Sequence, residues 1–243
     1  MNRLHGMILL GALLITATLP VQTFAQSATA IKYGDVAKGE LTTSKTSITY
    51  TFKANANDVV ILKMKGDGTD SNVAPLLTVT DSKKQAVADS TKQFSLYSIT
   101  LVFQITAAGS FTIVASTTDT VKSLGKFQLA LSKATILQSG TSVNGHATSE
   151  QPAYFAYSSG DPFTISYAKQ AGDFAPAVNV SQVADDFSLS EPIGTIGGSL
   201  ATAGTVSITP ATNQLFIVSV EQSTFDFNSK VTADFTLQVD VAK

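Results

Sequence analysis

Residues 127–131 read FQLAL and residues 235–239 read FTLQV, so an apolar side chain stands at alternate positions of both segments. Strict alternation of this kind is typical of a β-strand with one face in a hydrophobic core. The two segments close two stretches of roughly one hundred residues each, about the size of a single β-sandwich domain. The sequence therefore predicts two copies of one strand-rich fold.

Further landmarks recur in the same order in both stretches. A glycine opens each stretch, an aromatic run follows, and an apolar segment that begins with proline comes next. In the two stretches these landmarks are Gly39 and Gly145, residues 50–52 and 154–157, and Pro75 and Pro176. A shared order of landmarks at this period indicates a tandem repeat rather than one large domain.

Every strongly patterned segment beyond the leader has period two, and none has the period of an α-helix. We therefore expect an all-β protein with two tandem antiparallel β-sandwiches, at residues 26–134 and 135–243. The join at residues 133–135 contains no Gly-, Ser- or Pro-rich spacer, which predicts a nearly fixed angle between the domains. Residues 185–200, rich in Gly and Pro, are expected to form a long loop.

Residues 1–25 have the pattern of a secretory signal peptide. Arg3 provides the positive start, residues 7–19 are apolar and uncharged, and Ala25 ends a stretch of small residues suited to cleavage. The apolar run is shorter than the roughly 20 residues that span a bilayer. We expect a secreted protein, extracellular or periplasmic, with no membrane span after cleavage. An uncleaved leader that acts as an anchor is the alternative.

The composition excludes several classes of site. The chain has no Cys and only 2 His, so neither a disulfide nor a zinc site with several nitrogen or sulfur ligands can form in one chain. A formal net charge of -2 argues against a nucleic-acid partner. His146 is interpreted as a polar turn residue rather than as the base of a catalytic triad. Loop carboxylates that could serve a hydrolase are Asp185, Asp186, Glu191, Glu221 and Asp226.

A glycine-rich turn at residues 66–72 is the sharpest candidate for a metal site. Asp67, Asp70 and Asn72 would supply hard oxygen ligands, which calcium prefers. The spacing does not match an EF-hand loop, and Asp and Gly are also the ordinary residues of a solvated turn. No other cofactor is expected, and calcium remains a hypothesis for this turn.

Four aromatic residues lie beside polar loops rather than at alternating core positions. They are Phe94, Tyr97, Phe225 and Phe227. If they are exposed together, they would form a binding patch. The chain contains no Trp and only 6 Tyr, so it offers few of the flat platforms on which sugar-processing enzymes stack their substrates.

The first copy resembles the bacterial pre-peptidase C-terminal (PPC) domain family. The resemblance rests on the order of residues 39–41, 50–52, 58–62, 75–81, 108–114 and 125–129. The second copy matches less well, since residues 209–214 replace the Ala-Gly-Ser turn of the first. The resemblance implies a jelly-roll β-sandwich that serves secreted enzymes or surface proteins as an accessory module, without catalysis of its own.

Together these observations favour a secreted, non-catalytic binding or adhesion module over an enzyme. Its expected partners are a polysaccharide, a cell-envelope component or further copies of itself. The alternative is a structural subunit of a surface layer or fibre that associates through exposed edge strands. A hydrolase based on the loop carboxylates is a third hypothesis.

Overall fold

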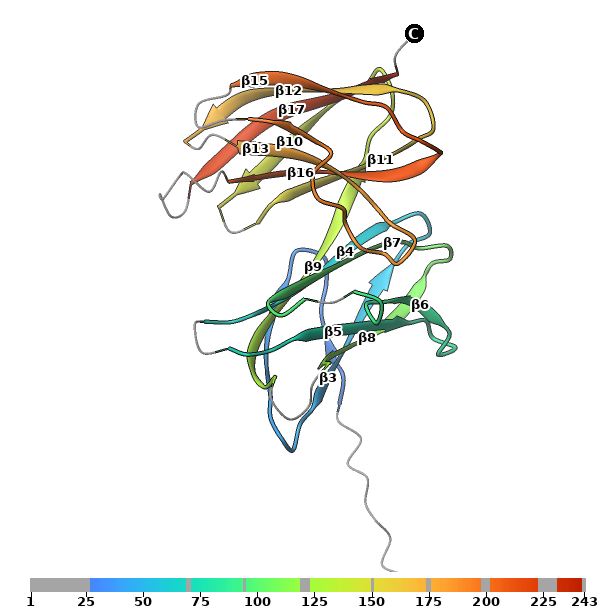
Figure 1. The fold of residues 1–243 in the computed structure, drawn as a ribbon, viewed down its shortest axis with the longest axis vertical. Helices are drawn as coiled ribbons and strands as arrows, with labels where there is room; N and C mark the ends of the chain where they lie inside the picture. Colours follow the sequence, from blue (N-terminus) through green and yellow to red (C-terminus); the bar gives the residue numbers. More distant parts are fainter. Residues whose placement is uncertain are drawn as a thin grey trace, which may run out of the picture.

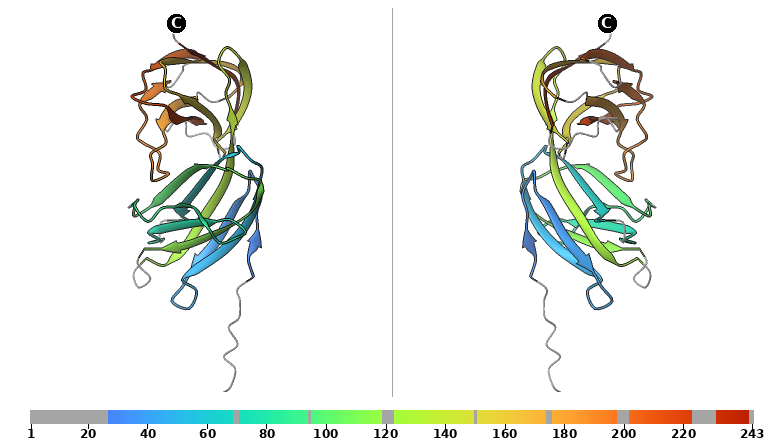
Figure 2. Two further views of the ribbon diagram at one scale, coloured as in Figure 1. Left: turned by 90° about the vertical axis from the view of Figure 1, so that its right-hand side faces the viewer. Right: turned by 90° about the vertical axis from the view of Figure 1, so that its left-hand side faces the viewer.

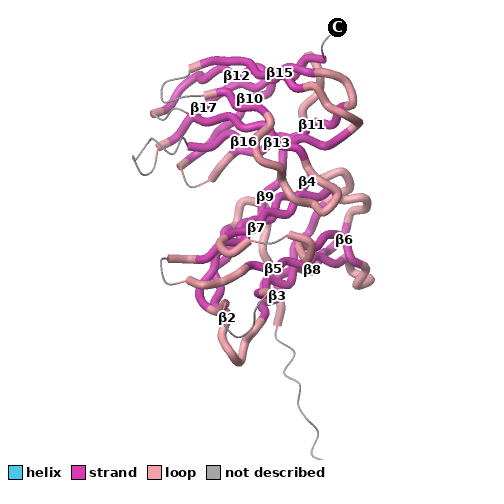
Figure 3. The backbone as a smooth tube through the Cα atoms, in the orientation of Figure 1, coloured by secondary structure: helices cyan, strands magenta, loops and turns pink. Residues whose placement is uncertain are grey.

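A computed structural model describes residues 27–243 except 69–70, 94, 119–122, 150, 174–175, 198–201, 223–230 and 242–243. Within these residues the regular secondary structure consists of β-strands, as Figure 3 shows. The expected all-β class with two tandem sandwiches is confirmed. The proposed signal peptide, residues 1–25, lies outside the described residues. No helix in the described part of the chain is long and apolar enough to cross a membrane.

The first sandwich packs two sheets face to face. One sheet has the order β2-β9-β4-β7 and the other the order β1-β3-β8-β5-β6. The bounds are β1 Thr29–Ala30, β2 Val36–Leu41, β3 Ser47–Ala54, β4 Val59–Gly66, β5 Pro75–Thr80, β6 Ala86–Asp89, β7 Ser98–Gln104, β8 Gly109–Thr117 and β9 Gly125–Ile136.

The second sandwich repeats this plan strand for strand. Its sheets have the orders β10-β17-β12-β15 and β11-β16-β13-β14, which match β2-β9-β4-β7 and β3-β8-β5-β6. Eight strands in two four-stranded sheets, with the chain moving between sheets, make a jelly roll. The bounds are β10 Ser142–Thr148, β11 Ala153–Ser159, β12 Phe163–Gly172, β13 Pro176–Gln182, β14 Gly194–Ile196, β15 Ala203–Ile208, β16 Gln214–Gln222 and β17 Thr232–Val241.

The glycine landmarks have the same role in both sandwiches. Gly39 lies opposite Phe127 between β2 and β9, and Gly145 lies opposite Phe235 between β10 and β17. A Cβ added at either glycine would come within 2.5 Å or 2.3 Å of the facing ring, so no larger residue fits without displacing it. Both prolines also begin equivalent strands, β5 and β13. The pattern that predicted the repeat therefore reflects equivalent packing.

Each sandwich has its own core of alternating side chains. Leu62, Leu101 and Phe127 are almost fully buried in the first, and Phe163 and Phe235 in the second. Figure 1 shows the result as four stacked layers, with the β10-β17-β12-β15 sheet at one end and the β3-β8-β5 sheet at the other.

A third apolar cluster joins the two sandwiches. It consists of the residues Val59, Ile61, Val102, Ala134, Ala156 and Ile217, all 1% exposed or less. We name it the joint. It lies between the outer face of β4, β7 and β9 and the outer face of β11 and β16, and it removes the contacting part of each face from water.

Strand β9 runs without interruption from the first sandwich into the second. It pairs with β2 and β4 and then, at Thr135 and Ile136, runs parallel to β11. The proposed boundary between residues 134 and 135 thus falls inside a strand, where main-chain hydrogen bonds restrain rotation. Residues 133–135 are not a linker.

The expected long loop at residues 185–200 reaches back to the first sandwich. Val102 N donates to Phe187 O (2.8 Å), Gln93 Nε2 donates to Asp186 O (3.0 Å), and the Phe187 ring packs against the first core. Phe187 has a positive φ of 64°, uncommon for a bulky residue. The segment is less irregular than expected, because it contains β14. Figure 2 shows this loop and β9 on opposite sides of the join.

Equivalent positions differ according to whether the other sandwich covers them. Ile61 and Val102 pair across β4 and β7 in the joint, while their counterparts in the second sandwich, Thr164 and Ser207, face outward. The hydroxyls of that pair are 3.0 Å apart. When the two sandwiches are aligned on Phe127 and Phe235, these outward positions are therefore apolar only where the other sandwich covers the sheet.

The other sheet of each sandwich shows the same difference between covered and exposed positions. Ala156 and Ile217 pair in the joint, and their counterparts in the first sandwich are Thr51 and Thr112 on the outer face of β3 and β8. Equivalent hydrogen bonds fix this alignment, since Ile31 N donates to Thr51 O and Leu137 N donates to Ala156 O, each at 2.9 Å. Both ends of the stack thus present hydroxyls to solvent.

Replacing Phe187 with Ala is expected to lower the free energy of unfolding by about 1–3 kcal/mol, less than for a fully buried ring because Phe187 is only partly buried. Urea unfolding measures this, and limited proteolysis should show faster cleavage at residues 184–190. Ile193→Ala is the control, since Ile193 is 48% exposed in the same segment. Equal effects of the two substitutions would contradict a clamping role for Phe187.

Candidate binding cleft

A cleft of about 620 Å³ lies between the two sandwiches. Its floor is the outer face of β2, β9 and β4, beyond the joint. Its walls come from residues 33–36 at the start of the first sandwich and from β10 and residues 149 and 151–155 of the second. A volume of this size falls within the range of small-ligand sites, and the rigid join keeps its walls at a fixed separation.

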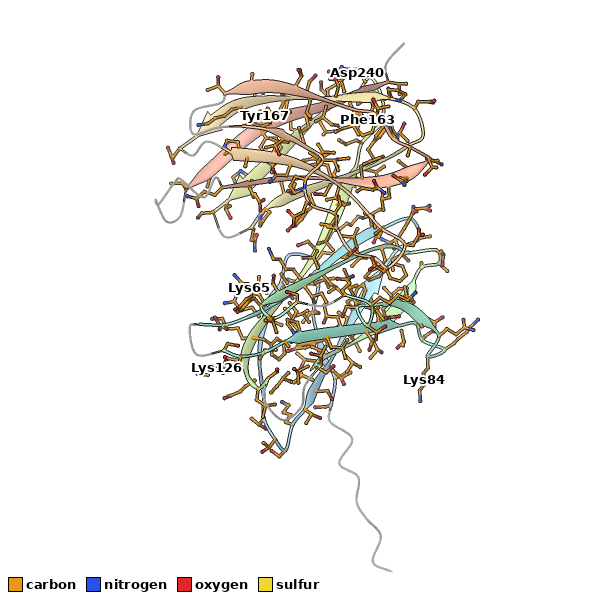
Figure 4. All side chains as sticks on the ribbon, in the orientation of Figure 1. Lys65, Lys84, Lys126, Phe163, Tyr167 and Asp240 are labelled. Carbon is orange, nitrogen blue, oxygen red and sulfur yellow. The ribbon has the colours of Figure 1, made fainter. Side chains whose placement is uncertain are left out.

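Two lysines stand on the cleft floor. Lys63 and Lys65 are alternate residues of β4, so they project from the same face, opposite Ala130 and Gln128 of β9. Figure 4 labels Lys65 on the side of the first sandwich that faces the second. Among the residues that the structure describes, no carboxylate lies within 4.0 Å of either ammonium group.

The other lysines near the cleft are neutralised. Lys133 Nζ lies 2.6 Å from Asp58 Oδ1, and Lys38 Nζ lies 3.5 Å from Asp67 Oδ2. Among the described residues of the lining, Asp35 is the carboxylate, and its Oδ2 accepts a hydrogen bond from the main chain of Lys32. Among the described lysines of the lining, Lys63 and Lys65 are therefore the two without an ion-pair partner, and Asp35 is a carboxylate without one.

Asp58 lies behind the cleft lining and holds two of its residues, Tyr33 and Lys133. Its side chain is only 5% exposed, and Oδ2 accepts hydrogen bonds from Tyr33 Oη (3.1 Å) and Asn55 N (3.0 Å). Burial alone would raise its pKa, but bonds from Lys133, Asn55 and Tyr33 outweigh burial and hold the pKa below its ordinary value. Burial, followed by the bond to Asp58, raises the pKa of Tyr33, so the phenol stays neutral.

The second sandwich closes the cleft with polar groups. Gln151 Nε2 donates to Gly34 O (3.1 Å) and so links the two walls directly. Burial, assisted by the charge of Glu221, raises the pKa of Tyr154 to about 12, which keeps its hydroxyl protonated at neutral pH. The wall therefore offers neutral hydrogen-bonding groups rather than charge.

A shallow depression continues from the cleft over β10 and β17. It has a volume of about 510 Å³ and is lined by the residues Asn144, Gly145, His146, Gln170, Asp234 and Phe235. The Phe235 ring packs under Gly145 and is only 1% exposed, so the depression is shallow there. The depression shares three residues with the cleft, so both belong to one continuous surface.

The interpretation of His146 as a turn residue is wrong. It lies within β10, and its Nδ1 is 2.6 Å from Asp234 Oδ1 of the neighbouring β17. The pair resembles part of a catalytic triad, but the acid of a triad is buried, whereas both side chains here are 56% exposed. The pair is a surface hydrogen bond between neighbouring strands.

The proposed calcium ligands are only partly described. Asp70 lies outside the described residues. Asp67 already contacts Lys38, and its Oδ1 accepts from Gln128 Nε2 (2.8 Å). No group of three or more His, Asp or Glu suited to a metal is found in the described part of the chain. Calcium binding at this turn stays a prediction.

The proposed aromatic patch is also only partly described. Phe94, Phe225 and Phe227 lie outside the described residues. Tyr97 is 77% exposed and precedes Ser98, which pairs with Lys65. The exposed Tyr97 ring therefore lies near the end of the β4 row that carries the cleft lysines.

Two of the proposed loop carboxylates, Asp186 and Glu221, form local hydrogen bonds. Ser188 donates its hydroxyl to Asp186 (2.6 Å), and bonds from its hydroxyl and N–H lower the Asp186 pKa. Glu221 accepts from Asn179 Nδ2 (2.9 Å) on the sheet of β13 and β16. Asp226 lies outside the described residues.

No protein-family model matches the chain, and no curated protein matches it. Solved structures do match, though at low similarity. The pre-peptidase C-terminal domain of collagenase from Bacillus anthracis is 15% identical, with 44% of this chain and 95% of that domain covered and a TM-score of 0.37. The CBM22 tandem of Xyn10C from Paenibacillus barcinonensis is 12% identical, with 86% and 92% covered and a TM-score of 0.28.

The CUB1-EGF-CUB2 segment of human MASP-1/3 is 6% identical, with 85% of this chain and 99% of that segment covered and a TM-score of 0.23. Similarities at this level carry no argument about function. The resemblance to the PPC family therefore stays a prediction, and the function has to be argued from the cleft itself.

Replacing Asp58 with Asn is expected to lower the free energy of unfolding at neutral pH by about 1–3 kcal/mol, because Lys133 and Tyr33 lose a charged partner. The pKa of Asp58 is lower in the folded protein than in the unfolded chain. Its contribution is thus present above pH about 4 and is lost as the pH falls through the folded pKa.

Urea unfolding of both proteins across this pH range measures the effect, with Asp161→Asn as an exposed control. The difference between the wild type and Asp58→Asn should shrink in acid. A difference that is the same at pH about 2 as at neutral pH would contradict this account.

Proposed function

We propose that the protein is an extracellular, non-catalytic binding module that holds a polysaccharide in the cleft between its two sandwiches. The observation that supports the proposal most directly is the cleft, with walls from both sandwiches. Continuous β9, the joint and the bond from Gln151 to Gly34 fix its shape before any ligand arrives. Pre-organised sites bind at a lower entropic cost than sites that must order.

The chemistry of the cleft suits binding better than catalysis. It presents amide, hydroxyl and ammonium groups, which form hydrogen bonds with an extended polar chain. Asp58, buried behind the lining, is held ionised by Lys133, so it is not available to donate a proton at neutral pH. The shallow depression over Gly145 extends the surface and would accommodate further units of a polymer.

A fibre built by stacking this fold end to end is disfavoured by the outer faces. The joint requires apolar residues, and the equivalent exposed positions carry Thr51, Thr112, Thr164 and Ser207. Burying unpaired hydroxyls costs free energy that burial of Ile and Val does not. We infer that two sandwiches complete the stack.

Blocking the cleft is expected to abolish binding. In Ala130→Trp an indole would cover the floor between Val36 and Lys63, and glycan-array signals of the purified secreted form should fall at least tenfold. Thr205→Trp places the same ring on the exposed strand β15 and is the control. Circular dichroism confirms that both variants fold. Binding that survives Ala130→Trp but not Thr205→Trp would place the site elsewhere.

The secreted form is expected to be monomeric in size-exclusion chromatography with light scattering over a wide concentration range. A variant with Thr51→Ala, Thr112→Ile, Thr164→Ile and Ser207→Val would carry joint residues on both outer faces. This variant should associate, because its ends become complementary. Polymers of the wild-type protein would instead support the surface-layer or fibre hypothesis.

A further inference from the structure

The charge on the cleft floor indicates which class of polysaccharide the cleft would bind. Lys63 and Lys65 point to one side of β4 and are spaced about 7 Å apart along the strand, as alternate strand residues are. Each ammonium is a donor of three hydrogen bonds with no ion-pair partner in the described structure. Two such groups in a cleft favour a ligand that brings its own negative charges.

The acidic side chains near the cleft do not neutralise Lys63 or Lys65. Asp58 is fully engaged by Lys133, Tyr33 and Asn55. Asp67 is held by Lys38 and Gln128. Asp35 is the described carboxylate of the lining, and it lies within 4.0 Å of neither Lys63 nor Lys65, so both lysines keep an unpaired positive charge.

The cleft also lacks the main feature of sites for neutral sugars. Such sites stack an exposed aromatic ring against the apolar face of a sugar. Tyr33 is not a free platform, because its ring packs edge-on against Phe52 with Lys133 6.0 Å from its centroid. Tyr154 is largely covered by the joint. The exposed ring near the floor, Tyr97, lies outside the cleft lining.

We propose that the cleft selects an acidic polysaccharide, with carboxylates of successive or alternate sugar units bound by Lys63 and Lys65. The amide side chains of the wall, such as Asn144, are placed to bond the hydroxyls of the same chain. This inference rests on the proposed function, since it specifies the ligand of the same cleft. Charge-assisted hydrogen bonds are stronger than neutral ones, so the lysines should dominate selectivity.

The test compares polygalacturonate with its fully methyl-esterified form, which keeps the backbone and removes the charge. Isothermal titration calorimetry on the secreted form should show binding of the acid and at least tenfold weaker binding of the ester. Lys63→Met with Lys65→Met should weaken binding of the acid at least tenfold. Lys53→Met with Lys83→Met removes the same net charge from exposed positions outside the cleft and should leave affinity within about twofold.

Each remaining outcome separates this inference from the function on which it rests. If acid and ester bind equally, and Ala130→Trp abolishes both, the cleft is a polysaccharide site and the acidic selectivity is overturned. If the cleft-lysine and control variants weaken binding equally, or dextran sulfate binds as well as polygalacturonate, the attraction is general charge and the inference is again overturned.

If the acid does not bind while the array shows another glycan blocked by Ala130→Trp, only the acidic ligand is refuted. If no glycan binding depends on the cleft, both proposals fail.

Discussion

The structure depends on the passage of β9 through both sandwiches. A strand that belongs to two sheets cannot bend at the boundary without breaking its hydrogen bonds to β4 on one side or to β11 on the other. The joint adds apolar burial beside it, and Phe187 closes the opposite side. Two sandwiches that could have been connected by a mobile linker are therefore held as one body. A cleft with walls from both can exist only under this constraint.

The repeat shows how one fold acquires two different outward surfaces. The inward positions of both copies carry similar apolar residues, because each copy must fill a core of similar width. For example, Phe127 and Phe235 lie under the equivalent glycines Gly39 and Gly145. The outward positions are free to diverge. They carry Ile61 and Val102 where a sheet is covered, and Thr164 and Ser207 where it meets water.

The sequence predicted what depends on local periodicity. Alternation identified the strands, and the glycines and prolines aligned the copies, because these residues meet the same steric demand in each sandwich. His146 was misjudged because a glycine before it was read as a turn, whereas Gly145 lies within a strand to make room for Phe235. The joint could not be inferred, since outward Ile and Val within a strand such as β4 are also consistent with a strand buried on both faces of one domain.

The cleft was missed for a different reason. The alternation of Lys63 and Lys65 with buried Leu62 and Met64 was visible in the sequence, but alternating lysines on a strand most often face bulk water. What makes them a candidate site is the wall from residues 149 and 151–155, which is distant in sequence and is positioned by β9. The carboxylate that neutralises Lys133 is likewise set by a contact between Asp58 at the start of β4 and the end of β9.

These long-range contacts decide the electrostatics of the cleft. Had the Asp58 carboxylate been exposed and unpaired, its negative charge would have repelled an anionic ligand. Paired with Lys133 and screened by Tyr33, it contributes almost no net field at the floor. The ion pair of Asp58 and Lys133 therefore holds one part of the cleft lining in place. The unpaired positive charges lie on β4, where a ligand can reach them.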